Sequence, residues 1–156
     1  SPNEKGKDIK LVNADGVGSV KKNCIEDGLC VAFVTTTEEG VDCTRSGNAE
    51  TCRLGGYNFY GSTASGNSHN RVVEAAVNCR DAGMTLATKN QLQAIVNALG
   101  KEYFAKMSEV YNINYFAAKG RSGNIGINSY SNSSGDYTTY ESFNTPLVGV
   151  CVGSDN

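Results

Sequence analysis

Residues 68–100, SHNRVVEAAVNCRDAGMTLATKNQLQAIVNALG, decide the fold of this chain. Apolar residues at helical spacing predict a first helix over residues 71–82. Gly83 follows it and supplies the left-handed conformation that commonly ends a helix. The apolar face of this first helix is formed by Val72, Val73, Ala76 and Val77.

A second helix follows a short extended link over residues 84–87. Thr88 and Gln91 form a T-x-x-Q capping box, which marks a helix start. Gly100 marks its end, and a further short helix is predicted over residues 101–111. The apolar face of the second helix has the spacing i, i+3, i+4 and i+7: Leu92, Ile95, Val96 and Leu99.

Length and charge limit the classes of function. With 156 residues, the chain forms one domain, or one domain with a small appendage, and can bury a core. Its net charge of −2 gives no electrostatic reason to bind nucleic acid or an anionic membrane surface. The apolar runs are far shorter than a membrane span, so we expect no membrane contact.

Six cysteines, Cys24, Cys30, Cys43, Cys52, Cys79 and Cys151, indicate disulfides. None forms a C-x-x-C pair and His69 is the only histidine, which disfavours a zinc site. Disulfides imply an oxidising compartment, so we expect an extracellular or cell-surface protein. Sequential pairing, Cys24–Cys30 and Cys43–Cys52, is the simplest arrangement. Cys30–Cys43 with Cys24–Cys52 is its rival.

Short strands are predicted on both sides of the helices. The clearest is β-branched and covers residues 29–37. Residues 8–12 form either a strand or the end of a helix. The other candidate strands cover residues 55–62, 115–118, 125–127 and 147–152.

The segment N-C-R-D-A-G, then M-T-L-A-T, then a second helix, resembles the first half of a C-type-lectin-like domain. The resemblance implies an α+β fold with two helices, small antiparallel sheets and long loops over residues 56–156. A cysteine-containing N-terminal subdomain over residues 1–55 precedes it. In this family a cysteine of the first helix pairs with one of the final strand, which implies Cys79–Cys151. The resemblance also implies that residues 55–62 pair with that final strand.

In such domains the segment before the last strand carries the ligand surface. Here residues 112–144 are rich in Asn, Ser, Gly and Tyr, a mixture that antibody loops also use for binding. The stretch is similar to that of bacterial and phage lectin-like proteins diversified by retroelements, although the final strand lacks their arginines. A hydrophilic surface loop without a ligand is the alternative interpretation. The expected ligand-binding residues are Tyr130, Asn132, Asp136, Tyr137, Tyr140 and Asn144.

We expect non-catalytic binding of a protein or glycan at a cell surface, without a cofactor. The E-P-N, Q-P-D and W-N-D segments of calcium-dependent lectins are absent from the sequence, so no calcium site is expected. His69 is interpreted as a surface residue rather than a catalytic base, and no phosphate loop or nucleophile elbow occurs. The alternative function is a structural fibre subunit, because the composition also resembles the globular head of a type IV pilin or pseudopilin.

Overall fold

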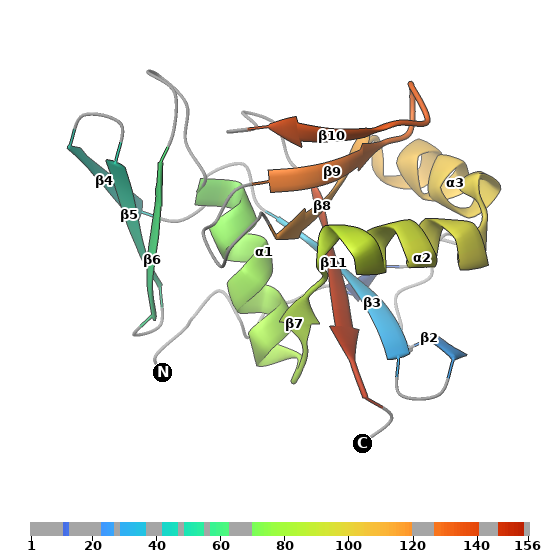
Figure 1. Cartoon of the computed structure of the whole chain (residues 1–156), viewed down its shortest axis with the longest axis horizontal. Helices are drawn as coiled ribbons and strands as arrows, with labels where there is room; N and C mark the ends of the chain where they lie inside the picture. Colours follow the sequence, from blue (N-terminus) through green and yellow to red (C-terminus); the bar gives the residue numbers. More distant parts are fainter. Residues whose placement is uncertain are drawn as a thin grey trace.

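The computed structural model describes residues 11–12, 23–26, 29–36, 42–46, 49–54, 57–62, 70–119, 127–140 and 147–154. Within these ranges the protein is a mixed α+β structure with three helices, two sheets and three disulfides (Figure 1). No helix of the described part is long and apolar enough to cross a membrane.

The helices agree closely with the predicted ones. Helix α1 covers Asn70–Asp81, and Gly83 after it has a φ of 77°. Helix α2 covers Lys89–Leu99 and begins with the predicted capping box: the Thr88 hydroxyl accepts from the Gln91 amide, and the Gln91 side chain accepts from the Thr88 amide. Helix α3 covers Lys101–Tyr111 and ends at Asn112, whose φ of 53° is left-handed.

The main sheet has the strand order β1-β3-β11-β8-β9-β10, with β2 also on β3 and β7 also on β11. Its last strand, β11, is antiparallel to β3 and parallel to β8, and therefore lies in the middle. Of the expected strand over residues 125–127, residues 125 and 126 lie outside the described residues, and Ile127 is the first residue of β9. The strands cover β1 Leu11–Val12, β2 Asn23–Glu26, β3 Leu29–Thr35, β7 Thr85–Leu86, β8 Tyr115–Lys119, β9 Ile127–Ser131, β10 Tyr137–Tyr140 and β11 Val148–Gly153.

Both faces of the main sheet are covered, which explains why β3 is apolar from Leu29 to Val34 and β11 carries no polar side chain. Val31 and Phe33 of β3 point into the core shared with α2 and α3. Ala32 and Val34 point the other way, into a second core shared with α1. Successive side chains of a strand face opposite sides, so a strand between two helical layers needs apolar residues at every position. The helices therefore form layers on the two faces of the sheet.

A second sheet contains β4 (Asp42–Ser46), β5 (Ala49–Leu54) and β6 (Tyr57–Ser62). Residues 55–62 were expected to pair with the final strand, and this is wrong. β6 pairs with β5 instead, and β3 pairs with β11. Only Gly55 and Gly56 separate β5 from β6, so a local hairpin closes at a much smaller entropic cost than a distant pairing.

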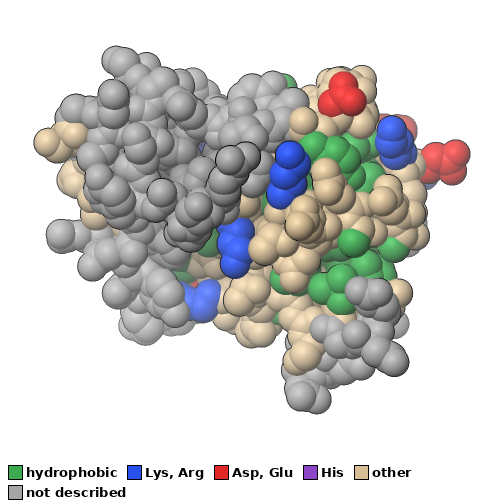
Figure 2. Space-filling model, in the orientation of Figure 1, with side chains coloured by type: hydrophobic (Ala, Val, Ile, Leu, Met, Phe, Trp, Pro, Cys, Tyr) green, Lys and Arg blue, Asp and Glu red, His purple; other side chains and the backbone are tan. Residues whose placement is uncertain are grey.

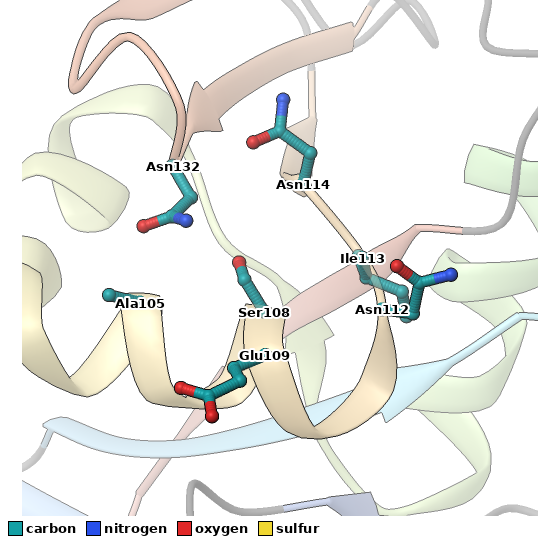
Figure 3. Close-up of a pocket in the computed structure, with 7 residues that line it drawn as sticks. All are labelled: Ala105, Ser108, Glu109, Asn112, Ile113, Asn114 and Asn132. Carbon is teal, nitrogen blue, oxygen red and sulfur yellow. The ribbon is translucent and has the colours of Figure 1, made fainter.

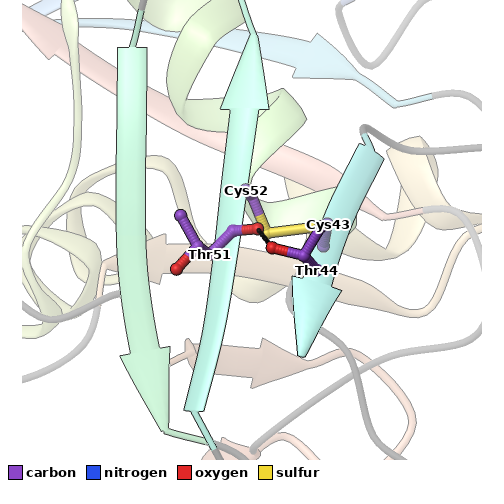
Figure 4. The surroundings of a disulfide bond; sticks show 4 residues. All are labelled: Cys43, Thr44, Thr51 and Cys52. Atoms are coloured by element: carbon purple, nitrogen blue, oxygen red, sulfur yellow. Dashed lines mark hydrogen bonds between the residues drawn. A yellow bond between two sulfur atoms is a disulfide. The ribbon is translucent and has the colours of Figure 1, made fainter. Parts of the chain in front are cut away.

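The disulfides follow the sequential pairing, and the rival pairing is wrong. Cys24–Cys30 joins β2 to β3, and Cys79–Cys151 joins α1 to β11 with a Cα–Cα distance of 5.4 Å. Cys43–Cys52 joins directly opposite residues of β4 and β5 (Figure 4). The division into segments 1–55 and 56–156 stays a prediction. The main sheet places β3 of the first segment beside β11 of the second.

Candidate functional site

The turn between β9 and β10, residues 132–136, is held in shape by one side chain from the link after α3. Asn114 donates from Nδ2 to the Ser131 hydroxyl at 3.2 Å, and its Oδ1 accepts from the Ser133 amide at 2.8 Å. Its backbone carbonyl accepts from the Asn132 amide at 2.9 Å. A single asparagine thus makes three hydrogen bonds to three consecutive residues.

The turn also closes on itself. The Ser131 amide donates to the Asp136 carbonyl at 3.0 Å, and the Gly135 amide donates to the Ser131 carbonyl at 2.8 Å. Gly135 has a φ of 69°, a conformation that glycine adopts without steric cost. The Ser134 hydroxyl accepts from the Asp136 amide. These contacts fix the backbone from which Asn132 and Asp136 project.

A pocket of about 340 Å³ lies between this turn and the C-terminal half of α3. Figure 3 shows Ser108 projecting from α3 and Asn132 projecting from the turn, each into the gap between the two elements. Asn114 points up toward the turn, whereas Glu109 and Asn112 lie at the outer edge. The lining residues are Ala105, Ser108, Glu109, Asn112, Ile113, Asn114 and Asn132.

Ser108 carries an unusual hydroxyl. Its Oγ is buried and has no hydrogen-bond partner in the described part of the chain. A serine inside a helix commonly returns its hydroxyl to the carbonyl one turn earlier, but this one does not. Buried polar groups are nearly always paired with protein or water, so an unpaired one beside a pocket indicates a place where a partner can bind.

On the other side of the turn lies a pair of tyrosines. Tyr130 is only 1% exposed and packs edge-on against Phe104 with ring centroids 5.4 Å apart. The half-buried ring of Tyr137 packs on Tyr130, also at 5.4 Å. Burial raises the pKa of Tyr130 above its usual value, and the Asp136 carboxylate raises it further. Burial, and then the neighbouring Tyr130, likewise raise the pKa of Tyr137.

The structure separates the expected ligand-binding residues. Tyr130 lies in the core, where it packs on Phe104 of α3. Asn132 lines the pocket, Asp136 is exposed on the turn, and Tyr137 is half-buried at its end. Tyr140 is the last residue of β10, and the prediction for its side chain lies outside the described residues, as does Asn144.

Sequence reasoning missed the contribution of α3. That helix was recognised by its apolar residues. Beside them runs a second stripe of small and polar residues with spacing i, i+3, i+4 and i+7, which ends at the C-cap residue Asn112. A stripe of this kind beside an Asn-rich segment is the signal that could have found it. The stripe consists of Ala105, Ser108, Glu109 and Asn112.

The described part of the surface around the pocket carries charged side chains. In Figure 2 the Asp and Glu side chains on this face gather at the end where α3 and the β9–β10 turn lie, with Lys or Arg among them. The described residues contain no group of three or more His, Cys, Asp or Glu side chains suited to a metal ion. No family model matches the chain, and no match was found among the curated proteins or the solved structures.

Proposed function

We propose that this protein is a non-catalytic binding domain of an extracellular or cell-surface compartment, and that the β9–β10 turn with its pocket is the binding surface. The observation that carries the proposal is the way in which Asn114 holds the turn. A surface that is ordered before its ligand arrives loses less entropy on binding than a flexible loop. Asn114 provides that order through three hydrogen bonds, two made by its side chain and one by its backbone carbonyl.

The side chains around the turn suit a polar ligand. Asn132 offers both a donor and an acceptor, and the exposed Asp136 offers acceptors. Tyr137 adds a half-buried ring of the kind that gives contact area at little entropic cost. This combination favours a glycan, whose hydroxyls donate and accept, over a ligand that is bound by apolar contact.

We further propose a C-type-lectin-like arrangement for the main sheet and its helices. Two observations support it. Cys79 of α1 is bonded to Cys151 of β11, as the resemblance implies. An earlier strand also pairs with the final one, although this strand is β3 and not residues 55–62. The three disulfides are compatible with the proposed oxidising compartment.

Binding of the fluorescently labelled protein to an array of immobilised glycans, neutral and acidic, tests the proposal. Asn132→Ala removes the pocket amide without touching the Asn114 contacts, of which Asn132 contributes only its backbone. We expect this variant to lose about tenfold in apparent affinity, corresponding to roughly 1.4 kcal/mol.

Asn97→Ala is the matched control, because Asn97 is an exposed asparagine on α2 that does not line the pocket. It should bind as the unmodified protein does. An array without any bound glycan, or equal loss in the two variants, would contradict the proposed binding surface.

A further inference from the structure

The polar groups at the pocket define a ligand class, on the condition that the proposed binding surface is right. Two of them face each other across the gap: the Asn132 amide from the turn and Ser108 from α3 (Figure 3). Both side chains donate and accept hydrogen bonds. Hydroxyl groups have the same double character, so a ligand with several hydroxyls can satisfy both sides at once.

The unpaired hydroxyl of Ser108 strengthens this argument. Its Oγ is buried without a partner in the described residues, next to a volume that a ligand can enter. Serine changes rotamer readily, so a hydroxyl placed in the pocket can become the missing partner. An apolar ligand would leave Ser108 and Asn132 both unpaired, which makes apolar ligands a poor match.

The pocket is an open depression in the surface, so its size limits how much of a ligand it can hold. A volume of about 340 Å³ lies at the lower end of the range for small-molecule sites. It corresponds to about ten water molecules at liquid density. One sugar ring fits such a volume, whereas a longer chain must extend beyond it along the turn. Ala105 and Ile113 provide small apolar surfaces for the C–H groups of a ring.

The charge of the residues that line the pocket further restricts the class of ligand. Among the described residues that line the pocket, Glu109 alone is charged, and its carboxylate accepts hydrogen bonds but repels anions. A cation lies at the turn: Lys101 Nζ is 3.3 Å from where a Cβ would stand on Gly135. Neither Gly135 nor Lys101 is among the described residues that line the pocket.

We propose that the pocket between α3 and the β9–β10 turn takes one uncharged, polyhydroxylated ring of monosaccharide size, held by Asn132 and Ser108. Glu109 at the edge disfavours acidic sugars. The pocket would distinguish ligands by how well their hydrogen-bond donors and acceptors match those of the site and by the charge of Glu109. Neither kind of discrimination needs a metal ion.

The test is a titration of the ¹⁵N-labelled protein with the methyl glycosides of glucose, galactose and mannose, followed by NMR. Methyl glucuronide is added because it differs from methyl glucoside only at C6, where a carboxylate replaces the hydroxymethyl group. We expect saturable shifts at the amides of residues 105–114 and 131–133 with at least one neutral glycoside. The glucuronide should bind about fivefold more weakly than the glucoside, and Glu109→Gln should reduce that difference.

Ser108→Ala separates a binding role from a structural one. It removes an unpaired hydroxyl, so the melting temperature should stay the same or rise, while the affinity for the neutral glycoside falls about fivefold. Asn97→Ala again serves as the control and should leave both quantities unchanged.

The result of the titration is distinguishable from that of the glycan array. The inference is overturned if no neutral glycoside gives saturable shifts at these residues, if the glucuronide binds best, or if Ser108→Ala leaves the affinity unchanged. A glycan bound on the array in an Asn132-dependent way would then still support the proposed function. Failure of the array would remove the proposed function, and this inference with it.

Discussion

Gly149 lies on β11 where helix α1 crosses the main sheet, and its replacement by alanine tests the packing of these two layers. An added Cβ would lie 2.7 Å from the Ala75 Cβ and 3.0 Å from Val34 Cγ2. Ala75 and Val34 are both fully buried. The helix cannot move away freely, because Cys79 of α1 is bonded to Cys151, two residues along the same strand.

The expected magnitude follows from two opposing terms. Overpacking of a filled core costs about 1–3 kcal/mol. Alanine also restricts the unfolded chain, which returns about 0.4–1 kcal/mol. We therefore expect Gly149→Ala to lower the free energy of unfolding by about 1–2 kcal/mol. For a chain of this size the melting temperature would fall by about 3–6 °C.

Gly153→Ala is the matched control on the same strand. There the three atoms nearest to the new Cβ all belong to Met84, with Cγ at 3.2 Å. Methionine is flexible and can move aside, so the change in stability should stay within about 0.5 kcal/mol.

Thermal unfolding followed by circular dichroism measures both variants. Ala75→Gly alone should cost about 1 kcal/mol, because glycine weakens the interior of a helix. In the Gly149→Ala background the same substitution should cost about 1 kcal/mol less, which is the coupling energy of a double-mutant cycle. Equal stability of Gly149→Ala and Gly153→Ala, or a coupling energy of zero, would refute the close packing of α1 on β11.

Two further predictions concern the disulfides and the tyrosines. Replacing both Cys79 and Cys151 by alanine should lower the free energy of unfolding by about 4 kcal/mol through chain entropy, because the sequence separation is 72. Replacing both Cys24 and Cys30, which are only 6 apart, should lower it by about 2 kcal/mol. Denaturant unfolding of the two double variants measures both losses, and equal losses would contradict the prediction. Because the pKa values of Tyr130 and Tyr137 are raised in the folded state, the unfolded chain loses these protons first as the pH rises. Stability is therefore fully present below about pH 10 and falls above it. Tyr137→Phe should make that fall shallower in unfolding curves recorded from pH 8 to 11, and an unchanged slope would speak against a raised pKa of Tyr137.

The helices were predictable because their signals are local. The Thr88–Gln91 capping box and the left-handed Gly83 lie next to the helices that they begin or end. The strand pairing was not predictable in the same way, since it depends on which distant strand competes best. β6 has a local partner in β5, and β3 is apolar on both faces as a central strand must be.

The site was predictable only on one of its two sides. The Asn- and Ser-rich composition after α3 led to Asn132, Asp136 and Tyr137. It also led to Tyr130, which the sheet places in the core, because the polar neighbours of that residue in β9 conceal its packing on Phe104. The residues that α3 contributes to the pocket could not be predicted, because tertiary packing decides which face of a helix is left uncovered.

The most direct test of the proposed binding surface is chemical-shift mapping of the best glycan from the array on the ¹⁵N-labelled protein. We predict that the largest shifts fall on the C-terminal half of α3 and on residues 131–137. Asn132→Ala should reduce these shifts at equal ligand concentration, while Asn97→Ala should not. Shifts concentrated on the second sheet, β4–β5–β6, would place the binding surface elsewhere and contradict the account.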